Sequence, residues 1–163
     1  MDGNDIEKLR NLEIIPKLYS SELVEDWAYI ISGLSSLFFS TYYIDIEHDT
    51  YRPVTQLRRV EDLLGDEVSC SAALMIYANH FIHPDDREEY LQVMSMENLR
   101  EKLRWWQPCV AMEYRRIPDE LNVSPQSWSW VRASVVLARK GEDDRPQTAV
   151  YVAQDITGGR KVG

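Results

Sequence analysis

The sequence contains few cysteines, few glycines and few basic residues, and each shortage excludes a class of protein. The two cysteines, Cys70 and Cys109, form neither a CxxC pair nor a metal-type spacing, and without a signal peptide they indicate a cytoplasmic location. Seven scattered glycines provide no phosphate-binding loop. The net charge of −9 leaves no cluster of Lys and Arg for phosphates, so nucleic acid is not an expected partner.

Long hydrophobic runs are also missing. No segment reaches the ~20 apolar residues that a membrane-spanning helix requires, so we expect no direct membrane insertion. The longest apolar-rich stretch, WAYIISGLSSLFFSTYYI (27–44), is interrupted by Ser and Gly. The chain does have 163 residues, of which 44% are hydrophobic, and this is enough for one domain with a packed core.

Hydrophobic periodicity predicts that helices and strands are segregated along the chain. The expected elements are N-terminal helices, a β-hairpin (38–46 and 50–56), two short helices (59–65 and 71–81), one long helix (86–106) and three strands (108–117, 129–141 and 148–156). Gly65 is expected to end the first short helix. This order predicts an α+β fold with an antiparallel sheet.

The segment FIHPDDREEY (81–90) could be an acid–base or metal site, or the start of a helix. Asp85 suits an N-cap, with Glu88 three residues later completing a capping box. Asp86 then lies in the first turn, beside the positive end of the helix dipole. We favour the helix start over an acid–base enzyme that uses His83, Asp85 and Asp86, and we predict no catalytic residue.

Four blocks of sequence, in this order, resemble the PAS sensor family. They are YYIDIEHDTYR (42–52), FIHPDDREEY (81–90), MEYRRI (112–117) followed by WSWVRA (128–133), and VYVAQDIT (150–157). The resemblance is to the subgroup whose connecting helix begins with His-Pro-Asp-Asp, as in bacterial diguanylate cyclases and histidine kinases. One departure is the longer segment PDELNVSPQS, where the family usually has an Asp-Gly turn.

The resemblance implies a PAS fold, a five-stranded antiparallel sheet with helices on one face, over residues 37–157. Residues 1–36 would be flanking helices, and residues 158–163 would begin a linker to an output domain outside this sequence. The implied function is that of a sensory module in bacterial signal transduction, such as a two-component system, which binds an unknown small molecule or partner. Asp155, Ile156 and Thr157 would relay the signal to a covalently linked diguanylate cyclase or histidine kinase, and this domain itself would not be an enzyme.

The interior can be interpreted as a filled core or as a pocket for a small molecule, and the sequence leaves both open. The residues that we expect to face between sheet and helices are Tyr42, Ile44, Leu63, Met75, Phe81, Leu91, Met112, Tyr114, Val131, Ala133 and Val152. The hydroxyls of Tyr42 and Tyr114 would be the polar groups of such a pocket, because a buried hydroxyl needs a partner.

No cofactor is predicted. Haem would need an axial ligand, for which only His80 and His83 are candidates, and His83 is assigned to the helix start. A flavin photoreceptor of this family would need a cysteine in an Asn-Cys-Arg setting, whereas Cys70 lies in VSCSAAL. The segment Glu47-His48-Asp49 is interpreted as a hairpin turn and not as a metal site, because consecutive side chains point in different directions.

An apolar stripe in residues 21–34 predicts a helix that could form a homodimer interface with one face of the sheet. The stripe consists of Leu23, Trp27, Ile30, Ile31 and Leu34. Trp128 and Trp130 on the sheet could contact it. The alternative function is therefore a ligand-free module for dimerisation or protein interaction.

Overall fold

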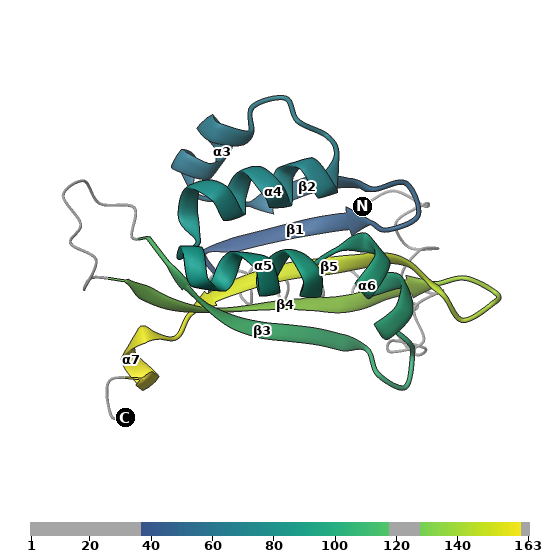
Figure 1. The fold of residues 1–163 in the computed structure, drawn as a ribbon. Helices are drawn as coiled ribbons and strands as arrows, with labels where there is room; N and C mark the ends of the chain where they lie inside the picture. The colour runs from purple at the N-terminus through teal and green to yellow at the C-terminus, as the bar shows by residue number, and fades with distance from the viewer. Residues whose placement is uncertain (1–36, 118–127, 161–163) are drawn as a thin grey trace, which may run out of the picture. The chain divides into compact units, whose positions relative to one another are not determined.

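The computed structural model describes residues 37–117 and 128–160, and the following account concerns those residues (Figure 1). Its elements are β1 (Ser40–Asp45), β2 (Thr50–Thr55), α3 (Arg58–Leu64), α4 (Cys70–Phe81), α5 (Pro84–Val93), α6 (Met96–Lys102), β3 (Cys109–Arg116), β4 (Ser129–Lys140), β5 (Pro146–Asp155) and α7 (Thr157–Arg160). None of the described helices is long and apolar enough to cross a membrane.

The five strands form one antiparallel sheet in the order β2-β1-β5-β4-β3. The last strand in sequence therefore occupies the centre, between β1 and β4. Helices α3 to α6 all come between β2 and β3 in the chain and cover one face of the sheet (Figure 1). This confirms the predicted α+β class and the PAS fold that the sequence resemblance implies.

Alternating small and large apolar side chains on the covered face of the sheet form the core. The buried strand positions recur with a period of two, as expected for a sheet with one face packed on helices. On the three last strands the buried apolar residues that follow this period are Met112 and Tyr114 on β3, Val131, Ala133 and Val135 on β4, and Ala149, Tyr151 and Ala153 on β5. Tyr90 of α5 and Leu99 of α6 pack into the same core and are almost completely buried.

Helix α5 begins earlier than predicted. Its N-cap is His83, whose Nδ1 accepts a hydrogen bond from the Asp85 backbone N–H at 3.1 Å, and Pro84 is the first helical residue. The prediction of Asp85 as N-cap, with Glu88 in a capping box, was therefore wrong. Proline suits the first helical position because its missing N–H would have no partner there in any case.

The predicted long helix is divided into α5 and α6. Ser95 is the N-cap of α6, with its Oγ accepting a hydrogen bond from the Asn98 backbone N–H at 3.1 Å. The prediction of one helix as far as residue 106 was wrong because a capping serine interrupts the apolar stripe. Trp105 and Trp106 lie instead in a turn, where they are 56% and 60% exposed.

The other short elements agree with the prediction. The hairpin of β1 and β2 turns at residues 46–49, and Gly65 is the C-cap of α3. The backbone φ of Gly65 is 53°, a left-handed conformation that glycine adopts without the steric penalty of a Cβ.

Candidate functional site

A hollow lined by tyrosines lies between the sheet and the helices. The residues of the sheet that line it are Ser40, Tyr42 and Ile44 of β1, Tyr51 of β2, and Tyr151 and Ala153 of β5. The helical residues that line it are Val60 and Leu64 of α3, Cys70, Ala73, Leu74 and Tyr77 of α4, and Tyr90 of α5. We refer to these thirteen residues as the tyrosine cavity. Its walls are mostly apolar with a few polar groups, which is the usual composition of a small-molecule site.

The tyrosine cavity is small. The space between its atoms is about 490 Å³ when the open mouth is counted, and the centre of a water molecule can reach about 50 Å³ of it. Pockets for drug-sized ligands usually measure ~300–1,000 Å³, whereas an apolar cavity of ~150 Å³ accepts benzene. The 50 Å³ is only about a third of the benzene cavity, so a ligand of one ring would also occupy the open mouth, and a large cofactor does not fit.

Tyrosine hydroxyls at the base of the cavity are hydrogen-bonded to one another. The Tyr77 and Tyr114 hydroxyls are 2.6 Å apart, and those of Tyr90 and Tyr151 are 2.9 Å apart. The ring centroids of Tyr90 and Tyr114 are 5.0 Å apart, with the rings edge to face, a favourable geometry for aromatic pairs. Because the partners come from α4, α5, β3 and β5, this network joins the helices to the sheet.

The buried side chain of Arg116 is hydrogen-bonded to this network. The Arg116 Nε donates to the Tyr77 hydroxyl at 3.1 Å, and its guanidinium lies 5.0 Å from the Phe81 ring centroid and 5.1 Å from that of Phe39. Cation–π contacts of this kind favour a desolvated arginine among aromatic rings.

Burial keeps the polar groups of the cavity uncharged. It raises the pKa of Tyr90, Tyr151 and Tyr42 above the ordinary value, because a phenolate would lose its hydration there. Burial, together with the nearby Asp49 carboxylate, raises the pKa of Cys70 to about 12. Cys70 is therefore a neutral thiol, and nucleophilic chemistry at this position is not supported.

Only two of the residues predicted for a pocket line the cavity, namely Tyr42 and Ile44. Seven others are packed in the surrounding core without lining it: Leu63, Phe81, Leu91, Met112, Tyr114, Val131 and Ala133. Met75 and Val152 were wrongly expected to face between sheet and helices. Met75 is 51% exposed, and Val152 lies on the face of β5 opposite to Tyr151 and Ala153.

Sequence reasoning missed Tyr51, Cys70, Tyr77, Tyr90 and Tyr151. A signal was available for Tyr151, because the small residues Ala149 and Ala153 flank it with a period of two and leave room for the ring. Both alternation phases are apolar in the middle of β5, however, and Val152 was chosen in its place.

The His-Pro-Asp-Asp segment attaches α5 to the edge strand β3. The Asp86 carboxylate accepts three hydrogen bonds from Arg115, from the backbone N–H, from Nε and from a terminal guanidinium nitrogen, each at 2.9 Å. This pairing lowers the pKa of Asp86. The structural interpretation of the segment explains its residues, since His83 caps the helix and Asp86 binds Arg115.

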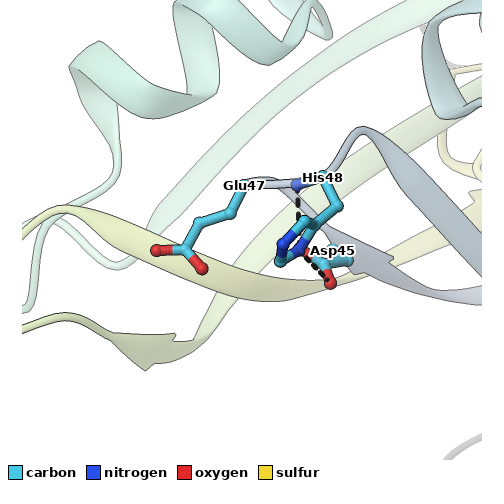
Figure 2. A group of neighbouring side chains, drawn as sticks. All are labelled: Asp45, Glu47 and His48. Atoms are coloured by element: carbon cyan, nitrogen blue, oxygen red, sulfur yellow. Dashed lines mark hydrogen bonds and ion pairs between the residues drawn. The ribbon is translucent and has the colours of Figure 1, made fainter.

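The β1–β2 turn brings Asp45, Glu47 and His48 together, with one possible ligand atom of each within 4.8 Å of the others (Figure 2). The His48 Nδ1 lies 2.9 Å from the Asp45 carboxylate, and the His48 backbone N–H donates to the same group at 3.1 Å. Asp49 is directed elsewhere, accepting a hydrogen bond from the Ser71 N–H at 2.8 Å. These bonds hold Asp45, His48 and Asp49 within the hairpin turn and at the start of α4.

The predicted relay residues lie where β5 ends beside β4. The Ile156 N–H donates to the Trp130 carbonyl at 2.9 Å, and the Trp130 N–H donates to the Thr157 Oγ1 at 2.9 Å. The Asp155 carboxylate accepts the Thr157 N–H at 2.8 Å. The Asp-Ile-Thr segment thus holds the first residue of α7 against the second residue of β4.

The predicted dimerisation stripe, Leu23, Trp27, Ile30, Ile31 and Leu34, lies outside the described residues.

No protein-family model matches the chain, and no curated protein matches it. Among solved structures the chain is similar to an RNA-binding Light-Oxygen-Voltage receptor, with 16% identity and a TM-score of 0.49 over 75% of this chain and 30% of that one. It is also similar to the N-terminal domain of a diguanylate cyclase with a PAS/PAC sensor from Marinobacter aquaeolei, with 14% identity and a TM-score of 0.47 over 74% and 96% of the two chains.

A third similar structure is a sensory box histidine kinase/response regulator from Burkholderia thailandensis, with 13% identity and a TM-score of 0.46 over 82% of this chain and 88% of that one. The chain spans less than a third of the Light-Oxygen-Voltage receptor. The PAS architecture described above rests on the strand order and the position of the helices in this chain.

Proposed function

We propose that this chain is the sensory module of a signalling protein, which binds a small molecule in the tyrosine cavity and relays its presence through β5. The observation that carries the proposal is the cavity itself, an apolar hollow with hydroxyl groups between the sheet and its helices. Tyr151 and Ala153 of β5 line it, and β5 leads directly to Asp155.

The relay would act where β5 leaves the sheet. Ala153 lies two residues before Asp155, so a ligand that displaces the β5 backbone at Ala153 also changes the strain on the bonds of Ile156 and Thr157 with Trp130. A ligand shifts such an equilibrium only by the difference in its affinity for the two states. The expected receiver is a covalently linked diguanylate cyclase or histidine kinase, which the sequence resemblance supports.

The experiment fills the cavity and measures the relay. Ala73→Leu places a larger side chain in the cavity, and Ala72→Leu is the matched control, because Ala72 is the neighbouring residue of α4 and does not line the cavity. We expect Ala73→Leu alone to change hydrogen exchange at the Trp130 and Ile156 amides. Equal exchange in both variants, with each folded by circular dichroism, would contradict the relay. Native mass spectrometry of the purified chain would test separately for a retained ligand.

A further inference from the structure

All polar groups on the walls of the tyrosine cavity are neutral. They are the hydroxyls of Ser40, Tyr42, Tyr51, Tyr77, Tyr90 and Tyr151, together with the Cys70 thiol. Among the described residues, those that line the cavity include no Asp, Glu, His, Lys or Arg. A charged ligand would lose its hydration in this space without meeting a counter-ion, which is strongly unfavourable.

Charged side chains interact with residues of the walls without lining the cavity. Arg116 approaches the Tyr77 hydroxyl from the far side, among the rings of Phe81 and Phe39. Asp49 acts on Cys70 from the other end, and its carboxylate is bonded to the Ser71 N–H at 2.8 Å. Glu67 acts on Tyr51 in addition, and none of these three charged residues lines the cavity.

The hydroxyls can serve a ligand that has its own hydrogen-bonding group. A hydroxyl donates one hydrogen bond and accepts up to about two, and it rotates to suit its partner. The high pKa of the buried tyrosines keeps these donors protonated. A ligand hydroxyl or carbonyl can therefore join the network of Tyr90 and Tyr151 without requiring a charge.

The rings favour an aromatic ligand. Tyr42 stands edge to face with both Tyr51 and Tyr151, with ring centroids 5.8 and 5.9 Å apart. Tyr77 and Tyr90 are 5.9 Å apart at a tilted angle. A further ring can make the same edge and face contacts, which add to the gain from apolar burial. The volume of the cavity allows at most one such ring, part of which would occupy the open mouth.

We infer that the tyrosine cavity binds an uncharged, monocyclic aromatic molecule that carries one hydroxyl or carbonyl group, with the ring among Tyr42, Tyr77 and Tyr151. This inference rests on the proposed sensory function for the place of the ligand, and it adds the chemical class. It excludes carboxylates and amines of the same size.

Three probes with the same ring test the charge: benzyl alcohol, benzoate and benzylammonium. Each is titrated into the full chain at pH 7 by isothermal calorimetry and by the shift in Tm. We expect benzyl alcohol to bind at least tenfold more tightly than either ion. Ala73→Leu should weaken it at least tenfold, whereas the control Ala72→Leu should leave it unchanged. Cys70→Leu, which fills the cavity from the start of α4, is the second filling variant in case Ala73→Leu does not fold.

Each other result overturns the inference. Benzoate or benzylammonium binding as tightly as benzyl alcohol, with loss in the filling variants, would overturn the chemical class and leave the sensory proposal standing. Binding that both filling variants leave unchanged would place the probe outside the cavity and overturn the site. No binding of any probe would overturn the class, and the exchange experiment on Ala73→Leu would still decide the sensory function.

Discussion

Helices α5 and α6 are held to the sheet by hydrogen bonds of arginine side chains, whereas Arg59 of α3 lies over the Phe81 ring of α4, 5.6 Å from its centroid. In α5 the Asp86 carboxylate accepts three hydrogen bonds from Arg115 of β3. In α6 the Arg100 guanidinium donates to the Ile46 carbonyl beyond β1 at 2.8 Å. Helix α3 begins after Leu57, which makes no side-chain capping hydrogen bond.

The packing differs in the same direction. Tyr90, Leu99 and the C-cap residue Leu103 belong to the large core cluster, whereas Val60 and Leu64 of α3 pack in a smaller cluster with Ala73 and Phe81. Both of these α3 residues line the tyrosine cavity. We infer from the difference that α5 and α6 are the more rigid helices, whereas α3 can move when a ligand binds. Weakly packed elements open at the lowest free energy.

The largest expected effect compares one leucine from each side. Leu99→Ala in α6 should lower the free energy of unfolding by about 2–5 kcal/mol, because it leaves a cavity in a closed core. Leu63→Ala in α3, at a half-buried position, should lower it by about 1 kcal/mol. Urea unfolding followed by circular dichroism measures both. Equal losses would contradict the distinction between the two sides.

A smaller effect is expected from the bond between α5 and β3. Asp86→Asn removes the charge from a carboxylate that is hydrogen-bonded to Arg115, and we expect a loss of about 1.5–3 kcal/mol, the usual range for hydrogen bonds to charged groups. Asp85→Asn is the matched control, because its side chain is 77% exposed against 17% for Asp86. The same urea experiment measures it, and an equal loss in Asp85→Asn, whose carboxylate lies 4.0 Å from the Arg115 guanidinium, would contradict the importance of the three hydrogen bonds to Asp86.

The smallest effect is the dependence of that bond on pH. Folding lowers the pKa of Asp86 below its ordinary value of 3.8, mainly through the hydrogen bonds from Arg115. The unfolded chain therefore binds the proton more readily, and the stabilisation is complete above about pH 5 and lost as the pH falls through the folded pKa. The difference in unfolding free energy between wild type and Asp86→Asn should shrink over the same range. A constant difference from pH 7 to pH 3 would assign the effect to packing.

The sequence predicted the order and type of the five strands and of helices α3 and α4, because their local signals agree. Alternation in β3 and β4 matches the buried set, and Gly65 ends α3 as expected. Helix boundaries were less predictable where two signals compete. Pro84 and Asp85 both suit a helix start, and the proline took the first helical position with His83 as the cap.

The cavity was hardly predictable, and the reason is the composition of α4. Its sequence, CSAALMIYANHF, is apolar on nearly every side, so periodicity cannot distinguish the covered face from the exposed one. The wrong choice of Met75 and the omission of Tyr77 both follow from this. A cavity forms where side chains from elements distant in sequence leave space unfilled. Local sequence patterns do not contain this information.

The central position of β5 has a consequence for how the domain forms. The β1–β2 hairpin and the β3–β4 hairpin can each assemble from neighbouring segments, but they are joined only when residues 146–155 insert between them. Such distant pairings make folding slow and strongly cooperative. Tension on the polypeptide after Asp155 would thus act on β5, the strand that joins the two halves of the sheet. A force on β5 therefore acts directly on its pairings with β1 and β4.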